Sequence, residues 1–441
     1  MSSLPLEKLR RIAGAPNVLT GVDCSPYVLE GRTPEAVVFP GSKDDVVAIL
    51  GLAAEAGIAV TPSGGGTKLG IGTPPERLGL VLGLKRMCRI IEHEPGDLTT
   101  TAEAGISLAT LQGELAKRGQ WLSLDPPWAE RATLGGILAS NASGPRRHLY
   151  GTARDLLIGL TVVMADGSLV RGGGKVVKNV AGYDLPKLFI GSFGTLGVIV
   201  EATVKLRPRP DVDRLVVARF HHLKDAGGAA RAITGSDLVP SALELLDGEA
   251  LRAAGAGEGG AGLLIGVDGI AEQVDWQCAE VSRLLAPLGL VEARVMDGPA
   301  RDEVWRARGA LGHQAFGDVA AVMKWGVLPS QLAEVLEQGG AIAQRNGLRA
   351  AMVAHAGVGI ASAVLSGGGA DINAVVAALN EWRAMVVGAG GHALIEWAPL
   401  AVKERVEVWD APGPSARIMK ALKEKLDPRG ILNPGRFVGG I

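Results

Sequence analysis

Pro62-Ser-Gly-Gly-Gly-Thr-Lys68 is the stretch from which the fold of this 441-residue chain can be worked out. It follows Ile58–Val60, a short apolar run that is typical of a strand. Because the three consecutive glycines carry no Cβ, the backbone N–H groups of the loop can converge on an anion. A flexible turn is the simpler interpretation of the loop taken alone. Two common nucleotide-binding motifs are excluded, because no G-x-G-x-x-G runs into a helix here and Lys68 lacks the glycine spacing of a Walker loop.

The segments on both sides of this loop predict a mixture of strands and helices. Ser42 is the expected N-cap of a helix that ends at Gly57. Asp166-Gly167 is a strong hairpin signal between two apolar runs, and residues 200–206 alternate as in a half-buried strand. Further strands are expected at 78–84, 98–104, 157–164 and 168–171, and a helix at 107–118.

Arg207-Pro-Arg-Pro-Asp211 marks a domain boundary, because two prolines and three charges interrupt the pattern. Beyond it, strands alternate with longer amphipathic helices, expected at 272–285, 330–344 and 372–387. This second region therefore predicts a sheet covered by helices. A last helix is expected at 415–426.

Composition narrows the class of protein. Apolar residues make up 47% and charged residues 21%, as in a globular protein, and the net charge of -1 provides no basic field for nucleic acid or anionic lipid. Three scattered cysteines argue against a disulfide framework, a zinc ribbon or an iron–sulfur cluster, and a reducing cytoplasm is the simplest setting. Charges at residues 7–11 do not suit a signal peptide. Residues 350–370 carry no formal charge, but five glycines favour a buried strand and turn over a membrane span.

Three further motifs accompany the glycine loop. The first comprises Thr133-Leu-Gly-Gly136, Asn141-Ala-Ser-Gly144, Arg147 and Tyr150-Gly151, whose small and hydroxyl side chains suit a flat polar ligand. The second runs from Lys178-Asn-Val-Ala-Gly-Tyr-Asp184 to Gly191-Ser-Phe-Gly-Thr-Leu-Gly197, and the third is Asp427-Pro-Arg-Gly-Ile-Leu-Asn-Pro-Gly435. Taken singly, each is explained by a capped helix, a loop or a helix stop.

In this order and spacing, the four motifs resemble the vanillyl-alcohol-oxidase (PCMH-type) family of FAD-binding flavoproteins. The resemblance implies an α+β fold, with a PCMH-type FAD-binding domain of two α/β subdomains and an α+β cap domain of helix-covered antiparallel sheet. The expected divisions are an N-terminal helical segment at 1–32, the FAD-binding domain at 33–210, the cap at 211–400, and a C-terminal segment at 401–441 that returns to the FAD site.

The resemblance also assigns roles to individual residues. It places Ser63, Gly64, Gly65, Gly66 and Thr67 at the FAD pyrophosphate; Pro126, Thr133, Gly135, Gly136, Asn141, Ser143 and Gly144 along the ribityl chain and isoalloxazine, with Tyr150 and Gly151 close by; Gly197, Val198 and Ile199 on the adenine side; and Asn433 as the residue that closes the site. With no covalent anchor of the histidine or cysteine type in the first loop, FAD is expected to be non-covalent.

Within the family the chain is most similar to E-type subunits of glycolate oxidase. The signs are Leu124-Asp-Pro-Pro127, the motifs at 178–184 and 191–197, and the ending Asn433-Pro-Gly-Arg-Phe-Val-Gly-Gly-Ile441. The catalytic D-type relatives usually have Glu where Phe193 stands. Relatives that oxidise 2-hydroxy acids directly carry H-x-G-D-G-N-x-H, a metal-ligating and acid–base segment. The corresponding stretch here is His355-Ala-Gly-Val-Gly-Ile-Ala-Ser362, and valine and isoleucine cannot bind a metal. No metal is therefore expected, the catalytic residues stay unassigned, and His355 and His392 are interpreted as satisfied core residues.

These observations predict an FAD-binding subunit of a glycolate- or D-lactate-oxidising complex that passes electrons to an iron–sulfur subunit, with a D-type flavoprotein subunit as a further partner. A standalone FAD-dependent dehydrogenase of 2-hydroxy acids or polyols is the alternative, in which Arg146 or Arg147 would hold a carboxylate. An interaction subunit without flavin is the third possibility, and the intact glycine loop argues against it. The expected location is cytoplasmic, with peripheral attachment to the inner face of the membrane through partners.

Overall fold

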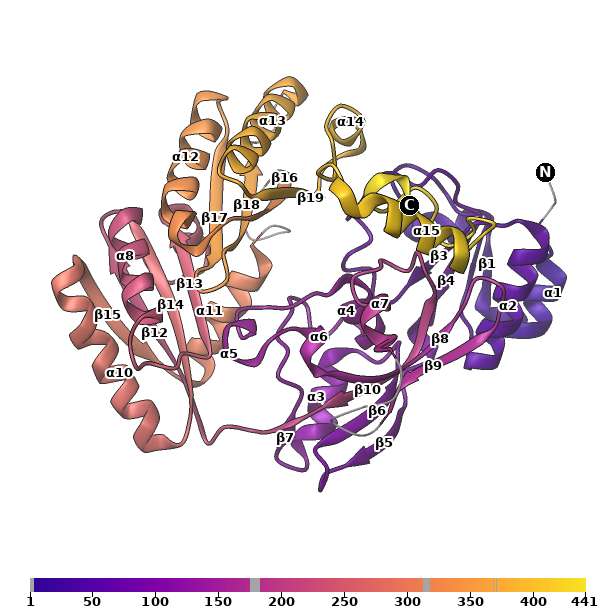
Figure 1. Ribbon diagram of the computed structural model, residues 1–441, viewed down its shortest axis with the longest axis horizontal. Helices are drawn as coiled ribbons and strands as arrows, with labels where there is room; N and C mark the ends of the chain where they lie inside the picture. Colours follow the sequence, from indigo (N-terminus) through magenta and orange to yellow (C-terminus); the bar gives the residue numbers. More distant parts are fainter. Residues whose placement is uncertain (1–3, 175–182, 312–317, 368, 370) are drawn as a thin grey trace. The chain divides into compact units, whose positions relative to one another are not determined.

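A computed structural model describes residues 4–174, 183–311, 318–367, 369 and 371–441, and divides the chain into two compact units (Figure 1). Unit 1 contains residues 1–143, 152–209 and 411–441, and unit 2 contains residues 144–151 and 210–410. These divisions differ from the predicted ones in three places. The N-terminal segment is part of unit 1, residues 144–151 join unit 2, and unit 2 ends at 410 rather than at 400.

The first half of unit 1 is a small sheet with the order β1-β2-β4-β3, in which β2, β3 and β4 are parallel. Its main helix, α2, begins where predicted, because Ser42 Oγ accepts a hydrogen bond from Asp45 N at 3.1 Å, and it ends at Gly57, which has a left-handed φ of 68°. The elements are α1 (Leu6–Ala13), β1 (Val18–Thr20), β2 (Ala36–Val38), α2 (Lys43–Ala56), β3 (Val60–Ser63) and β4 (Leu80–Gly83).

The second half of unit 1 is an antiparallel sheet with the order β5-β6-β10-β8-β9. The predicted hairpin at Asp166-Gly167 joins β8 to β9, with Val163 opposite Leu169. The elements are β5 (Ile90–Glu94), β6 (Thr99–Glu103), α3 (Leu108–Ala116), α4 (Leu134–Ser140), α6 (Ala153–Leu156), β8 (Leu157–Val163), β9 (Leu169–Gly173), α7 (Pro186–Phe189) and β10 (Val198–Lys205), and β7 (Gln120–Trp121) pairs with β11 (Arg207–Pro208). Part of the predicted motif at Lys178–Asp184 lies outside the described residues.

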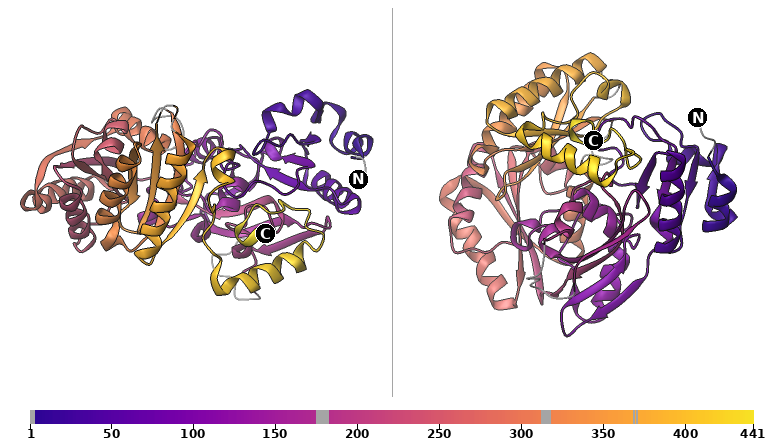
Figure 2. Two further views of the ribbon diagram at one scale, coloured as in Figure 1. Left: turned by 90° about the horizontal axis from the view of Figure 1, so that it is seen from above. Right: turned by 45° about the vertical axis from the view of Figure 1, so that its right-hand side comes forward.

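The C-terminal segment completes unit 1. After α15 (Ala416–Leu426), the chain passes beside β3, where Val60 N donates to Ile431 O at 2.7 Å and Asn433 N donates to Val60 O at 2.9 Å (Figure 2). Leu432 is thereby paired in parallel with Val60, the first residue of β3. The last motif of the sequence consequently lies next to the strand that leads into the glycine loop.

Unit 2 is built on one antiparallel sheet with the order β15-β12-β14-β13-β17-β18-β16-β19. Its strands are β12 (Val212–Phe220), β13 (Ala242–Asp247), β14 (Ala261–Gly269), β15 (Leu290–Met296), β16 (Val319–Gly326), β17 (Arg349–His355), β18 (Ile360–Ser366) and β19 (His392–Trp397). Its helices are α5 (Arg147–Tyr150), α8 (Leu223–Thr234), α9 (Gly248–Ala253), α10 (Ala271–Leu285), α11 (Gly298–Ala310), α12 (Leu332–Arg345), α13 (Ile372–Gly388) and α14 (Leu400–Lys403). Side chains of α8, α10, α12 and α13 form the core on one face of the sheet, and those of α9 and α11 form a smaller core on the other.

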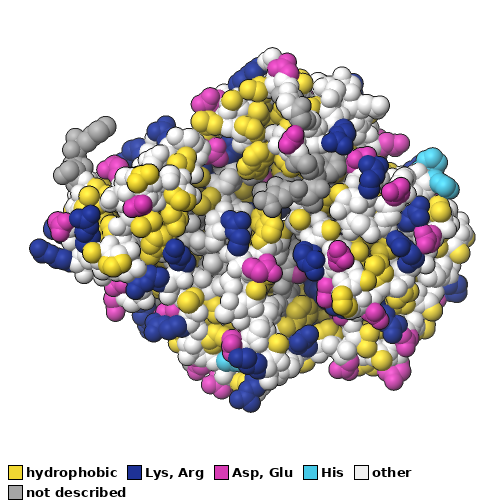
Figure 3. Space-filling view, turned by 180° about the vertical axis from the view of Figure 1, so that it is seen from behind, with side chains coloured by type: hydrophobic (Ala, Val, Ile, Leu, Met, Phe, Trp, Pro, Cys, Tyr) yellow, Lys and Arg dark blue, Asp and Glu magenta, His cyan; other side chains and the backbone are white. Residues whose placement is uncertain are grey.

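This architecture confirms the predicted α+β fold with a helix-covered antiparallel sheet. Residues 350–366 lie in the β17–β18 hairpin, so this part of the uncharged run is sheet core, as expected. No helix in the described part of the chain is both long enough and apolar enough to cross a membrane. On the face drawn in Figure 3, basic side chains are interspersed with acidic ones, which agrees with the net charge of -1.

Candidate cofactor-binding site

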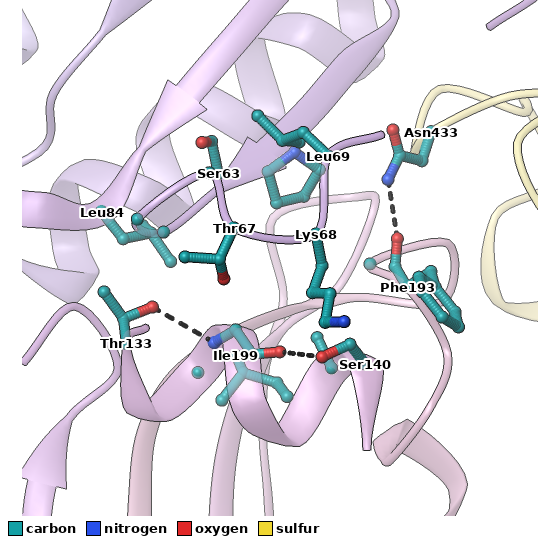
Figure 4. Close-up of a pocket in the computed structure, with 18 of the residues that line it drawn as sticks. Ser63, Thr67, Lys68, Leu69, Leu84, Thr133, Ser140, Phe193, Ile199 and Asn433 are labelled. Carbon is teal, nitrogen blue, oxygen red and sulfur yellow. Dashed lines mark hydrogen bonds between the residues drawn. The ribbon is translucent and has the colours of Figure 1, made fainter. Parts of the chain in front are cut away.

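A cavity of about 840 Å³, measured with its open mouth, lies within unit 1 where four segments meet (Figure 4). They are the loop after β3, the helix α4, the turn before β10, and the C-terminal segment. The four segments carry the four motifs that the sequence singled out.

The glycines of the loop are required by its packing against α4. A Cβ on Gly65 would lie 1.6 Å from Arg131 O, and one on Gly64 would lie 2.1 Å from Thr133 Oγ1. Gly66 adopts a left-handed φ of 75°, which glycine takes without strain. The sequence predicted a close approach of the loop to a ligand, whereas the structure shows that two of the three glycines also make room for the protein's own backbone and side chain.

The packing leaves backbone donors of the loop available. Within the described part of the chain, the N–H groups of Gly65, Gly66 and Thr67 donate no hydrogen bond. Consecutive free N–H groups on a loop bind anionic oxygens. The loop can therefore bind the pyrophosphate of a dinucleotide.

Helix α4 forms one wall of the cavity. Thr133 is its N-cap and accepts a hydrogen bond from Gly136 N at 3.3 Å. A Cβ on Gly135 would lie 2.7 Å from Ala104 Cβ, so this glycine allows the helix to pack closely against the end of β6. Gly136 and Ser140 line the cavity, and the Ser140 hydroxyl donates to Gly136 O at 2.7 Å.

The turn before β10 forms the second wall. Phe193 has a left-handed φ of 52°, and its N–H donates to Ala139 O at 2.8 Å, which joins the turn to α4. A Cβ on Gly194 would lie 3.1 Å from Pro62 Cγ, and one on Gly197 would lie 2.4 Å from Val162 Cγ1. The glycines of this motif thus allow the turn to lie against both β3 and β8.

A buried ion pair positions the C-terminal segment. Lys423 Nζ contacts Asp427 Oδ2 at 2.6 Å and donates to Thr195 O and Leu432 O, each at 2.8 Å. The Asp427 carboxylate also accepts from the N–H groups of Ile431 at 3.0 Å and Leu432 at 2.8 Å. Asn433 follows directly and donates to Phe193 O at 2.6 Å. The sequence interpreted Asp427 as a helix stop, but it also fixes the segment that carries Asn433.

Arg436 is a cavity residue that sequence reasoning missed. Its guanidinium is buried, donates to Leu69 O and Ile71 O, each at 2.5 Å, and lines the cavity. Burial lowers the pKa of Arg436 to about 10, so the side chain stays charged at neutral pH. This charge favours an anionic ligand in the cavity.

The cavity brings together twelve of the predicted site residues: Ser63, Gly64, Gly65, Gly66, Thr67, Thr133, Gly135, Gly136, Gly197, Val198, Ile199 and Asn433. Pro126, Asn141 and Ser143 belong to unit 1 but do not line this cavity, and Gly144, Tyr150 and Gly151 belong to unit 2. The residues that sequence reasoning missed are Pro62, Lys68, Leu69, Ile71, Leu84, Ala139, Ser140, Phe193, Gly194 and Arg436. Phe193 and Gly194 lie within the motif Gly191–Gly197, whereas a buried arginine close to Asn433 gave no signal of its own.

The donor and acceptor set fits FAD. Asn433 Oδ1 belongs to a residue that lines the cavity, is buried and has no hydrogen-bond partner within the described residues, and such an atom is costly unless a ligand or water meets it. FAD offers hydroxyl and imide donors to this oxygen, and phosphate acceptors to the free N–H groups of the loop. The cavity is lined by no histidine or cysteine among the described residues. Non-covalent binding of FAD stays a prediction.

Unit 2 contains a separate buried cluster around Glu244. Its carboxylate, which is 0% exposed, contacts His355 Nδ1 at 2.5 Å and Arg308 Nε at 2.6 Å. Burial opposes the charge of Glu244, but Arg308 and His355 hold its pKa below the ordinary value, while burial lowers the pKa of His355. His355 is therefore a hydrogen-bonded residue of the sheet with only 12% of its side chain exposed, which agrees with its interpretation as a satisfied residue.

Three other expectations for unit 2 have different outcomes. The interpretation of His392 as a core residue is wrong, because it begins the edge strand β19 and is exposed. Arg146 forms ion pairs with Asp213 and Asp268, and Tyr150 OH donates to Asp268 at 2.5 Å, so Arg146 is already engaged with carboxylates of the protein. In the part of the chain that is described, no three histidine, cysteine, aspartate or glutamate side chains are grouped as metal ligands.

Comparisons with known proteins identify the family. Residues 34–173 match the FAD binding domain, and residues 209–437 match the C-terminal domain of FAD linked oxidases. The chain is 32% identical to the glycolate oxidase subunit GlcD of Bacillus subtilis (strain 168), covering 92% of this chain and 89% of that one. It is 30% identical to a D-lactate dehydrogenase of Archaeoglobus fulgidus, covering 94% of each. Among solved structures, p-cresol methylhydroxylase shares the fold, with a TM-score of 0.78 and 20% identity over 98% of this chain and 95% of that one.

Proposed function

Because this chain belongs to the FAD-linked oxidase family and is an FAD-dependent oxidoreductase, we propose that it is the FAD-binding subunit of a complex that oxidises a small 2-hydroxy acid, such as glycolate or D-lactate. The observation that carries the proposal is the complete cavity of unit 1, in a chain whose full-length relatives include a glycolate oxidase subunit and a D-lactate dehydrogenase. We further propose that the predicted site residues contact FAD as assigned. The assignment to the E type stays a prediction, since the relatives named above include a GlcD subunit.

The residues of unit 1 divide the binding of FAD between charge, shape and polar contacts. The N–H groups of residues 65–67 and the buried Arg436 would receive the pyrophosphate, and Gly136, which has no side chain, would allow the cofactor to lie against α4. Asn433, held by its bond to Phe193 O, would present its unpaired Oδ1 to a donor. Bound FAD supplies the acceptor for the hydride of the carbinol carbon.

Electrons must then leave through another component. The described chain holds three free cysteines, of which Cys24 and Cys278 are buried and only Cys88 is exposed, so it offers no thiolate set for an iron–sulfur cluster. We propose that an iron–sulfur partner subunit takes these electrons, together with a D-type flavoprotein subunit, in a cytoplasmic complex attached to the inner face of the membrane through its partners.

One observation favours the alternative of a standalone 2-hydroxy-acid dehydrogenase. A histidine that is oriented by a buried carboxylate is the arrangement of a general base, and Glu244 holds His355 in this way. The Nε2 atom of His355 would then take the hydroxyl proton of the substrate.

The test is to purify the chain alone and together with its co-expressed partner subunits, and to measure dye reduction with glycolate and D-lactate. The proposal expects activity to follow the assembled complex. Full activity in the chain alone, abolished in His355→Ala but retained in the matched surface variant His392→Ala, would instead support the standalone dehydrogenase. Activity in neither preparation with either acid would contradict both.

A further inference from the structure

The two edges of the unit 2 sheet differ in how their backbone groups are satisfied. At β19, the outward-facing groups are covered by the chain itself, because Ile395 N donates to Val408 O at 3.0 Å and Ala393 N donates to Asp410 Oδ2 at 2.6 Å. At the other edge, β15 pairs only with β12, and in the described part of the chain its outer backbone groups have no partner (Figure 1). Open edges of this kind are sites for pairing with another strand.

The sequence of β15 is self-complementary. It reads Leu290-Val-Glu-Ala-Arg-Val-Met296, with Ala293 at its centre. In an antiparallel pair of two copies centred on Ala293, Glu292 lies opposite Arg294 twice and Val291 lies opposite Val295. The register shift next to Val291 leaves Leu290 and Met296 against the cores on different faces of the sheet, so these two do not pair. Opposite charges on directly opposed residues stabilise a pair of strands, and like charges destabilise it.

The side chains are accessible for such pairing. Val291 is 45% exposed and Val295 is 50% exposed, and the side chains of Glu292 and Arg294 are 41% and 45% exposed. Each charged residue has a partner in its own chain: Glu292 contacts Arg219 at 2.9 Å, and Arg294 donates to Ala256 O at 2.8 Å. A second copy would therefore add charge partners to residues that are already held in extended positions.

We propose that β15 is a homodimer interface, in which two copies of this chain pair their β15 strands antiparallel about a two-fold axis through Ala293. The same surface patch is used by both copies, as a two-fold interface requires. The regular ladder with β12 is interrupted next to Val291, where the register shifts between Arg219 and Phe220, so the new ladder is short. Since stable interfaces bury roughly 1,200 Å² or more, we expect a reversible, concentration-dependent dimer.

The test combines association measurements with site-directed cross-linking of the full flavin-loaded chain. Sedimentation equilibrium is expected to show a monomer–dimer equilibrium. Glu292→Arg alone and Arg294→Glu alone should each weaken association about tenfold or more, because each creates two like-charge pairs, and the double exchange should restore it. Glu280→Arg is the matched control, because it also reverses a charge and breaks an exposed ion pair, with Arg283, but lies on α10.

Cross-linking tests the register independently of any change in stability. In a Cys88→Ser background, Ala293→Cys should form an intermolecular disulfide, since opposed residues in antiparallel strands have Cα atoms about 4.5 or 5.5 Å apart, which a disulfide can span. Val295→Cys should not, because its counterpart is Val291. The proposal would be overturned by a chain that is monomeric at all concentrations, or by a dimer whose association is unchanged by the charge reversals. It would also be overturned by equal cross-linking at positions 293 and 295, or by a β15 that is protected from hydrogen exchange only when a different subunit is added.

Discussion

Gly65→Ala tests whether the glycine loop is fixed by its packing on α4, and the structure gives the size of the effect. The added Cβ would lie 1.6 Å from Arg131 O, and real Cβ contacts are essentially never below 3.0 Å. The two backbones must therefore separate by about 1.4 Å, which is the difference between these two distances. Hydrogen bonds from N–H groups have a distance range of only about 2.7–3.2 Å. A displacement of this size removes the N–H groups of residues 65–67 from the position in which they would meet the pyrophosphate.

The expected result is loss of bound FAD together with the stability that FAD contributes. Binding to the folded state alone stabilises it by about 2.7 kcal/mol at a hundredfold excess over Kd. The assay is the melting temperature with and without added FAD, together with flavin occupancy after gel filtration. The native chain should melt higher with FAD, and Gly65→Ala should show little change.

Two controls separate packing from strain. Gly66→Ala meets only Leu69 Cδ1 at 3.7 Å, so it should suffer the left-handed strain of roughly 1–2 kcal/mol but keep the FAD-dependent rise. Gly64→Ala clashes with the Thr133 hydroxyl, and Thr133→Ala should partly restore its flavin binding, because the nearest remaining atom, Thr133 Cβ, is 3.2 Å away. Full flavin occupancy in Gly65→Ala with an unchanged melting temperature would refute the reasoning.

Three further predictions concern other parts of the molecule. Asp427→Asn should reduce the free energy of unfolding by roughly 3–5 kcal/mol, because it leaves Lys423 charged and buried without its ion-pair partner, and it should also lower flavin occupancy. Chemical denaturation measures the free energy of unfolding. The control is the double variant Lys423→Met/Asp427→Asn, in which the loss of stability should be smaller. Burial raises the pKa of Asp247 to about 7, so the stability that the protonated side chain contributes is complete below the unfolded pKa of about 3.9 and is lost as the pH rises through 7. Over this range the free energy of unfolding of the native chain should fall relative to that of Asp247→Asn, which keeps the cap to Ala250 N. Parallel pH profiles of the two proteins would contradict this. Heating the flavin-loaded protein in acid should release intact FAD, and metal analysis should find no stoichiometric zinc, manganese or iron; flavin that stays on the precipitate, or one equivalent of metal, would refute these expectations.

Those parts of the fold that depend on local chemistry could be predicted from the sequence. Ser42 and Gly57 define the two ends of α2 within fifteen residues, and Asp166-Gly167 sets the β8–β9 hairpin from within the turn itself. The alternation of apolar and polar residues along β10 likewise predicted a strand, and the residues on its apolar face are buried. Each of these signals lies in the segment that it describes.

What could not be predicted depends on contacts between distant segments. Gly65 is a glycine because Arg131 lies against it, and the position of Asn433 depends on Thr195 through Lys423. Arg436 is buried against carbonyl groups of residues 69 and 71, which no local pattern indicates. His392 resembled a core histidine because its neighbours are apolar, but only the strand order shows that β19 is an edge.

The central claim is that the FAD of this chain receives the electrons of a 2-hydroxy acid and does so efficiently only in the assembled complex. Anaerobic stopped-flow mixing with saturating glycolate or D-lactate, followed by the visible absorption of the flavin, tests it directly. General acid–base help is worth roughly 10²–10⁴-fold, so the flavin in the isolated chain should be reduced slower by a factor of this order than the flavin in the complex. Equally fast reduction in the isolated chain, or no reduction by either acid in the complex, would contradict the claim.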